Sequence, residues 1–194
     1  MDMEQFRNLV VDTARKYGLR PSLVAGVIAV ESGWDPQAVS SAGAVGLMQV
    51  MPGEKIPGRP PTQALLDPAT NIDWGCRLLR EAWDRYGTTA GMLAAYYGAV
   101  DAQGRPTDAD DGSGVTGWEY VWRVEQAAER YREWDLAADP GFRQYAPLGG
   151  GWWEAAVNLK GVADDALATG RRLRDQLKQI GALAWQGVDL WGSR

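Results

Sequence analysis

One apolar run that ends in a carboxylate constrains the fold of this 194-residue chain more than any other stretch. Residues 21–31 read PSLVAGVIAVE, and the only acid in the run is its last residue, Glu31. A helix that is apolar on nearly every side is typical of a protein core. Pro21 suits a first helical turn, and Gly33 and Pro36 follow where a helix would end. The sequence therefore predicts a central buried helix with a carboxylate at its carboxyl-terminal end.

The rest of the first 135 residues predicts further helices and no strands. No segment there alternates apolar and polar residues as a half-buried strand would. Apolar residues instead recur at helical spacing, and capping residues precede several of the runs. The expected helices are residues 6–17, 21–31, 68–86, 89–97 and 117–134, with a helical turn or two at 44–51. Residues 33–44, 52–66 and 98–116 are expected to be irregular, and the fold class is all-α.

A different pattern follows the triple glycine at residues 149–151. Apolar residues between 152 and 191 recur with alternating spacings of four and three, which is a heptad seam. This predicts a long amphipathic helix whose apolar face needs a partner. We therefore divide the chain into a domain at 1–135, a linker at 136–151 and a C-terminal helical segment at 152–194.

Composition narrows the classes of partner. The formal net charge of −5 argues against nucleic acid and anionic membranes, because both attract basic surfaces. The chain has no His, which excludes histidine acid–base chemistry, and Cys76 alone forms no disulfide within the chain. No apolar stretch is long enough to span a bilayer. The N-terminus lacks the pattern of a secretory signal, so we expect synthesis in the cytoplasm of the producing cell.

Glu31 is the first candidate for chemistry. Apolar neighbours and the negative end of a helix dipole both disfavour an ionised carboxyl group, so we expect its pKa to be raised. A raised carboxyl pKa suits a general acid that works near neutral pH. The alternative from this stretch alone is a glutamate that turns to solvent at a helix end. Ten Trp and seven Tyr against two Phe likewise fit either saccharide-binding surfaces or ordinary helix packing.

Four blocks of sequence then follow the pattern of one known family. The first block combines the glutamate with a loop and a Gly-Leu-Met-Gln run, and the others are shorter. In order they are Glu31, Ser32, Pro36, Ser40, Gly43, Ala44, Gly46, Leu47, Met48, Gln49 and Pro52; Asn71, Ile72 and Gly75; Ala95 and Tyr96; and Tyr120, Val121, Arg123 and Val124. Over residues 1–135 the chain resembles the soluble lytic transglycosylases, relatives of goose-type lysozymes.

The resemblance implies a lysozyme-like catalytic domain that acts on peptidoglycan glycan strands, without a metal or cofactor. Glu31 would protonate the β-1,4 bond between N-acetylmuramic acid and N-acetylglucosamine. It would then act as base on the muramoyl C6 hydroxyl, which closes a 1,6-anhydro ring. The substrate-binding positions would be Ser40, Met48, Gln49, Tyr96 and Tyr120. For Met48 and Tyr120, core packing is the alternative.

Three features depart from the family pattern. Tyr97 stands where the third block usually has asparagine, and Thr116 stands where a glutamate often precedes the tyrosine of the fourth block. The loop at 98–116 is acidic and is expected to reshape the groove. Asp35, the nearby second carboxylate, is expected to be a non-catalytic loop residue. Two other functions stay open: a muramidase that uses water, and a weakly active structural component of a virion or secretion apparatus.

Family members of this kind occur in bacteriophage virions and tails. Together with the missing signal pattern and the long C-terminal helix, this favours delivery by assembly, so we expect a virion protein that is made in the host cytoplasm and acts in the periplasm or cell wall. The segment 152–191 would bind other virion or tail proteins, with self-association as a second candidate. The sequence predicts attachment, and not catalysis, for that segment.

Overall fold

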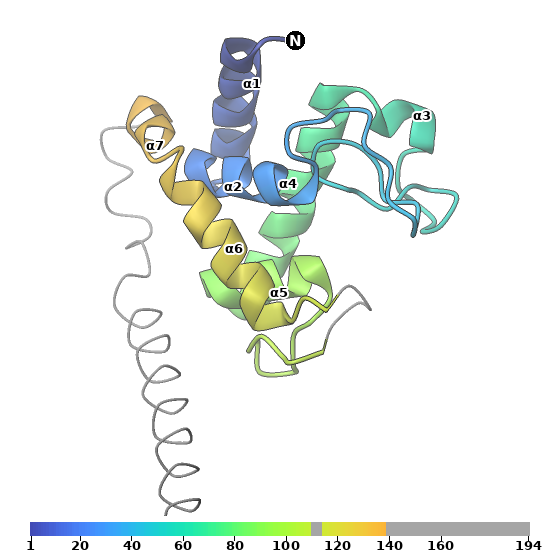
Figure 1. Cartoon of the computed structure of the whole chain (residues 1–194), viewed down its shortest axis with the longest axis vertical. Helices are drawn as coiled ribbons and strands as arrows, with labels where there is room; N and C mark the ends of the chain where they lie inside the picture. The colour runs from blue at the N-terminus through green and yellow to red at the C-terminus, as the bar shows by residue number, and fades with distance from the viewer. Residues whose placement is uncertain (110–113, 139–194) are drawn as a thin grey trace, which may run out of the picture. The chain divides into compact units, whose positions relative to one another are not determined.

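The computed structural model describes residues 1–109 and 114–138, which form seven α-helices joined by turns and loops (Figure 1). Within these ranges the β features are isolated bridges, so the predicted all-α class is confirmed for the described part. The helices are α1 (Met3–Lys16), α2 (Pro21–Glu31), α3 (Thr62–Leu65), α4 (Pro68–Tyr86), α5 (Thr89–Tyr97), α6 (Gly117–Glu129) and α7 (Glu133–Ala138).

The helices begin and end at residues that can pair the free backbone N–H and C=O groups of a helix end. The Asp67 carboxylate accepts a hydrogen bond from the Thr70 N–H at 2.9 Å and caps α4. The Thr88 hydroxyl oxygen accepts one from the Gly91 N–H at 3.1 Å and caps α5. Gly87 ends α4 in the left-handed conformation, which glycine adopts without steric cost. These short-range interactions fix the ends of α4 and α5. The bounds predicted for both helices from the sequence are confirmed.

The helix α2 is the centre of the core, as predicted. Its residues from Pro21 through Ile28 are all buried, and it packs against α1, α6 and α7 (Figure 1). The contact with α6 is close because α2 carries Gly26 at the crossing. A Cβ atom at Gly26 would lie 2.7 Å from the Val124 carbonyl oxygen and 2.9 Å from the Ala128 nitrogen. The backbones of α2 and α6 therefore approach as closely as glycine allows.

The prediction of helical turns at residues 44–51 was wrong. Antiparallel bridges join Val45 to Val39 and to Val50. Gly46 and Gln49 have φ angles of +73° and +48°, in the left-handed region, which an α-helix does not contain. The apolar side chains here are buried as a folded turn and not as a helix face.

A buried amide explains the shape of this turn. The Asn71 side chain, fully buried on α4, accepts a hydrogen bond from the Met48 N–H at 2.8 Å. Its amide nitrogen donates to the carbonyls of Val45 and Leu65 at 2.8 and 2.9 Å. One side chain thus satisfies backbone groups that a helix would pair internally, and it fixes the turn against α4.

Two other boundaries differ from the sequence prediction. The short helix α3 lies within residues 52–66, which were expected to be irregular, and the single helix expected at 117–134 is divided into α6 and α7. The division lets Tyr131 and Trp134 pack on Trp34, with ring centroids 5.5 and 5.8 Å apart. It also brings the Asp135 carboxylate to the first turn of α2, where it accepts from the Ser22 N–H at 2.8 Å. Tertiary contacts therefore override the continuous helical pattern.

The predicted heptad helix at 152–194 lies outside the described residues. So does the predicted linker, apart from residues 136–138 in α7. The division of the chain at 135 therefore stays a prediction. Across the part of the chain that is described, no helix has the length and apolar character needed to cross a membrane.

The crossing at Gly26 yields a prediction about stability. We expect Gly26→Ala to lower the free energy of unfolding by about 1–3 kcal/mol, the usual range for overpacking, because its Cβ meets backbone atoms that cannot rotate away. Urea denaturation measures the change. Gln126→Ala, on the exposed side of α6, is the control and should stay within about 0.5 kcal/mol of wild type. A Gly26→Ala protein that is more stable than wild type would contradict the close crossing.

Candidate active site

The site is built around a carboxyl group and a phenol from two helices that are far apart in sequence. Glu31, half-buried, is the last residue of α2. The Tyr120 hydroxyl on α6 donates a hydrogen bond to Glu31 Oε1 at 2.5 Å. Tyr120 is only 3% exposed, and burial, followed by the charge of Glu31, raises the pKa of its hydroxyl well above 10. The phenol is therefore protonated at neutral pH and is a permanent donor to Glu31.

A second tyrosine stacks on the first. The rings of Tyr97 and Tyr120 are nearly parallel, with centroids 4.5 Å apart and planes inclined by 13°. The Tyr97 hydroxyl donates to the Val115 carbonyl at 2.8 Å, which ties the end of α5 to the segment before α6. The residue that departs from the family pattern thus supports the phenol that contacts Glu31. The other departure, Thr116, caps α6 by accepting from the Glu119 N–H.

Hydrogen bonds to two distant segments fix the residues that follow Glu31. The Ser32 hydroxyl donates to the Leu47 carbonyl at 2.8 Å, which joins the end of α2 to the turn at 45–50. Trp34 has a φ of +72°, unusual for a bulky residue, and its indole N–H donates to the Tyr131 hydroxyl at 2.8 Å. Asp35 is exposed in the loop, as predicted, and its carboxylate accepts from the Gln37 N–H.

Of the predicted substrate-binding residues, Tyr120 contacts Glu31, and the others lie in or beside the turn at 45–50. The Tyr96 hydroxyl donates to the Met48 carbonyl at 2.6 Å. The Gln49 amide donates to the Gly46 and Ala38 carbonyls, and the Ser40 hydroxyl oxygen accepts from the Ala44 N–H. All three side chains are half-buried.

Met48 is different because its side chain is fully buried. A Cβ atom at Gly75 would lie 2.2 Å from the Met48 sulfur, so the thioether packs directly on the backbone of α4. In this structure the Met48 side chain belongs to the core, which fits the packing alternative. Its carbonyl contacts another predicted site residue, because it accepts the hydrogen bond from Tyr96.

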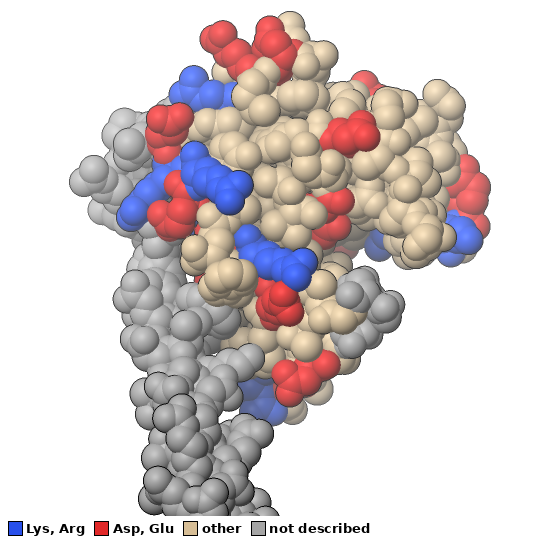
Figure 2. All heavy atoms as spheres, viewed as in Figure 1, with Lys and Arg blue, Asp and Glu red and all other residues tan. Residues whose placement is uncertain are grey.

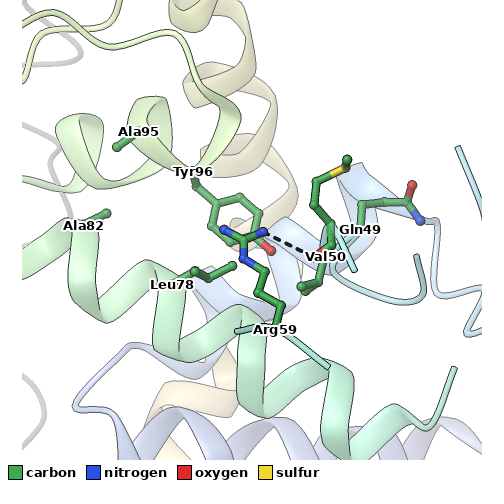
Figure 3. A pocket seen from close by; sticks show the side chains of 8 residues that line it. Gln49, Val50, Arg59, Leu78, Ala82, Ala95 and Tyr96 are labelled. Carbon is green, nitrogen blue, oxygen red and sulfur yellow. Dashed lines mark hydrogen bonds between the residues drawn. The ribbon is translucent and has the colours of Figure 1, made fainter. Parts of the chain in front are cut away.

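A pocket of about 170 Å³ lies beside Tyr96 (Figure 3). Gln49 and Tyr96 line it together with Arg59, which comes from the loop before α3. The sequence analysis missed Arg59, because a single arginine in a Pro- and Gly-rich loop gives no signal of its position. Over residues 1–109 and 114–138, no group of three His, Cys, Asp or Glu side chains could hold a metal ion.

Comparison with known families assigns the chain. The Transglycosylase SLT domain family matches residues 8–111, more than half of the chain. The chain belongs to this family. The match contains Glu31 and the turn at 45–50 and ends before Tyr120. It confirms the resemblance that the sequence motifs indicated.

Several relatives are similar over this region. The transglycosylase of Enterobacteria phage PRD1 is 45% identical over 87 residues, 44% of this chain and 32% of that protein. Membrane-bound lytic murein transglycosylase C of Actinobacillus pleuropneumoniae is 42% identical over 91 residues, 42% of this chain and 25% of that protein. The chain therefore matches only a quarter to a third of the length of these relatives.

Solved structures share the fold. An inactive glutamate-to-glutamine mutant of lytic transglycosylase Slt from Pseudomonas aeruginosa aligns with a TM-score of 0.51 and 26% identity, over 70% of this chain and 25% of that one. The 70-kDa soluble lytic transglycosylase in complex with bulgecin A aligns with a TM-score of 0.51 and 25% identity, over 68% and 24%. The predicted lysozyme-like, all-α fold is thereby confirmed for the part of the chain that aligns.

The raised pKa values of two tyrosine hydroxyls yield a prediction about alkaline stability. Burial raises the pKa of Tyr96 and of Tyr120 well above 10, the value expected in the unfolded chain. Above about pH 10 the folded state therefore keeps protons that the unfolded state loses, so stability falls as pH rises. We expect the free energy of unfolding of Tyr120→Phe to fall less steeply above pH 10 than that of wild type. Urea denaturation at several pH values measures both slopes.

Between about pH 8 and pH 9 both states keep the phenolic proton and carboxyl groups no longer titrate, so the difference between Tyr120→Phe and wild type should not change with pH there. Parallel slopes of the two proteins above pH 10 would show that the Tyr120 hydroxyl is not buried as described.

Proposed function

We propose that this chain is a peptidoglycan lytic transglycosylase that cleaves the β-1,4 bond between N-acetylmuramic acid and N-acetylglucosamine. The observation that carries the proposal is the Glu31 carboxyl group at the end of a buried helix, held by the Tyr120 hydroxyl, in a chain of the SLT transglycosylase family. Relatives named as transglycosylases support the same reaction.

In the proposed first step, the Glu31 carboxyl group donates its proton to the glycosidic oxygen as the bond to the muramoyl C1 breaks. In the second step, the Glu31 carboxylate takes the proton from the muramoyl C6 hydroxyl, and the C6 oxygen bonds to C1. The product is a 1,6-anhydro ring, and the glutamate regains its starting proton. One carboxyl group therefore serves as acid and then as base.

Tyr120 has a positioning role in this scheme. Its hydrogen bond fixes Glu31 Oε1, so the carboxyl group keeps one orientation during both proton transfers. The stacked Tyr97 holds the Tyr120 ring in turn. We propose that Ser40, Gln49 and Tyr96 contact the glycan. Met48 was predicted to do the same, and we propose that it acts through the turn that its buried side chain anchors.

The scheme needs no second carboxylate, whereas ordinary glycosidases use a pair. Asp35 follows Glu31 by four residues, but it is exposed in the loop and bonded to a backbone N–H. This arrangement favours the transglycosylase over the water-using muramidase. The inactive glutamate-to-glutamine mutant of the Pseudomonas aeruginosa relative supports the dependence on a glutamate.

We also propose delivery by a bacteriophage particle. The support is the similarity to the transglycosylase of phage PRD1. In this proposal residues 1–135 form the catalytic domain, and residues 152–191 attach it to virion or tail proteins or to further copies of the chain. The heptad pattern of that segment suits helix packing against a partner.

The first test removes the proposed acid. We expect Glu31→Gln to lower the rate of peptidoglycan cleavage by about 10²–10⁴-fold, because glutamine cannot donate and retrieve a proton. Mass spectrometry of digested peptidoglycan should show 1,6-anhydro-muramic ends with wild type. Asp35→Asn is the matched control and should keep both the rate and the product.

Cleavage by Glu31→Gln at the wild-type rate would remove Glu31 from the mechanism. Reducing, hydrated muramic ends as the wild-type product would instead show a muramidase. Thermal unfolding of both proteins checks that Glu31→Gln is folded like wild type.

The second test concerns the C-terminal segment. We expect a chain that ends at Tyr145 to cleave purified peptidoglycan like the full chain, but to be absent from particles when the producing phage is grown with it. The reason is that the catalytic groups all precede residue 135. Loss of cleavage by the shortened chain would show that the segment belongs to the catalytic domain, and its presence in particles would exclude attachment through 152–191.

A further inference from the structure

The pocket beside Tyr96 contains a cation that the proposed mechanism does not use. Arg59 lines the pocket, and no acidic side chain among the described residues lines it. Within the described part of the chain Arg59 has no ion pair, and its Nη1 makes one long contact of 3.4 Å with the Met51 carbonyl (Figure 3). Most of its donors are therefore available to a ligand, since a guanidinium has five N–H groups.

Most other described arginines are already paired. Arg77 and Arg123, for example, bind carboxylates one turn away on their own helices, and Arg20 faces Asp135. Figure 2 shows basic and acidic side chains lying beside one another over one face. A half-buried arginine in a pocket without a carboxylate is thus a complementary site for an anion.

An ordered loop presents this arginine. The Gly53 N–H donates to the Pro60 carbonyl at 2.7 Å, and a Cβ atom at Gly53 would lie 2.4 Å from the Arg59 carbonyl oxygen. The loop is therefore closed across its base by a contact that only glycine permits. Next to this contact, the Glu54 carboxylate accepts from the Thr62 N–H at 3.1 Å. The Arg59 backbone is fixed before any ligand arrives.

The pocket is polar on one side and apolar on the other. Gln49, Arg59 and Tyr96 supply polar groups, whereas Leu78 and Ala82 of α4 supply an apolar wall (Figure 3). The pocket has a volume of about 170 Å³, which is enough for a small polar group such as a carboxylate.

Tyr96 links this pocket to the reactive carboxyl group. After burial, the charge of Glu31 raises the pKa of Tyr96, and the charge of Arg59 lowers it. The Tyr96 hydroxyl also donates to the Met48 carbonyl, and the neighbouring Leu47 carbonyl accepts from Ser32, the residue after Glu31. The pocket and Glu31 therefore adjoin the same turn, at 45–50.

We infer that Arg59 binds a carboxylate of the muramoyl residue in the substrate. The inference rests on the proposed function, which supplies peptidoglycan as the substrate. The N-acetylated sugar backbone is neutral, and its anionic groups are the lactyl carboxylate of muramic acid or, where a stem peptide is attached, the carboxylates of that peptide. A guanidinium forms a bidentate hydrogen-bonded ion pair with a lactyl carboxylate or with a peptide carboxylate.

Binding to full-length Glu31→Gln protein tests this inference without turnover. Calorimetry at fixed salt compares three probes: a glycan with stem peptides, a peptide-free glycan with free lactyl groups, and a chitooligosaccharide, which has no carboxylate. In this background we expect Arg59→Gln to weaken at least one carboxylate-bearing probe about tenfold, as for a charged hydrogen bond. Chitooligosaccharide binding should not change, and the weakened probe identifies the source of the carboxylate.

Two further variants separate pairing from other effects. Arg59→Lys keeps the positive charge but cannot form the bidentate pair, so it should recover part of the affinity that Arg59→Gln loses. Lys55→Gln removes the same charge from an exposed position of the same loop, outside the pocket, and should bind all probes as before.

Equal weakening of the chitooligosaccharide by Arg59→Gln would overturn the inference, because the residue would then act by holding the loop. Unchanged binding of all three probes would overturn it as well. Failure of the wild-type chain to cleave peptidoglycan is a separate result and would count against the proposed function itself.

Discussion

The close crossing of α2 and α6 at Gly26 sets the position of the groups around Glu31. Because no side chain separates the two backbones, α6 runs near enough to α2 for Tyr120 to reach the end of that helix. The stack of Tyr97 on Tyr120 then links α5 to the same point. A carboxyl group at the end of a buried helix would be poorly oriented by apolar neighbours alone, and the crossing supplies the directional partner that those neighbours lack.

A second constraint acts from α4. The buried amide of Asn71 holds three backbone groups, of Met48, Val45 and Leu65, and so shapes the turn that carries the predicted groove residues. Separating the turn from α4 would leave these buried polar groups without hydrogen-bond partners, which costs free energy. The turn and α4 are therefore expected to fold together. The two walls of the candidate site, α6 with Tyr120 and α4 with the turn, are thus fixed by different kinds of interaction, one steric and one polar.

Local signals made much of this predictable. The apolar run before Glu31, the capping residues Asp67 and Thr88 and the glycine after α4 act over a few residues, and the helices that they bound agree with the sequence prediction. The turn at 45–50 was mistaken for a helix because its apolar residues are paired by a distant amide, which periodicity cannot show. The stacking of Tyr97 on Tyr120 and the position of Arg59 in the pocket also depend on long-range packing. From the sequence, Tyr97 was visible only as a departure from the family pattern, and Arg59 gave no signal.

The segment from 131 to 135 has a consequence for how this fold is divided in practice. Its aromatic side chains pack on Trp34, beyond the carboxyl end of α2, while the Asp135 carboxylate binds the Ser22 N–H at the opposite end. A short stretch outside the family match at 8–111 therefore contacts the first turn of the helix that carries Glu31 and the loop that follows this helix. A chimera or expression fragment cut at the limit of the match would keep the signature motifs, yet it would lose these contacts and omit Tyr120. The modular unit that can be moved between proteins is longer than the segment by which the family is recognised.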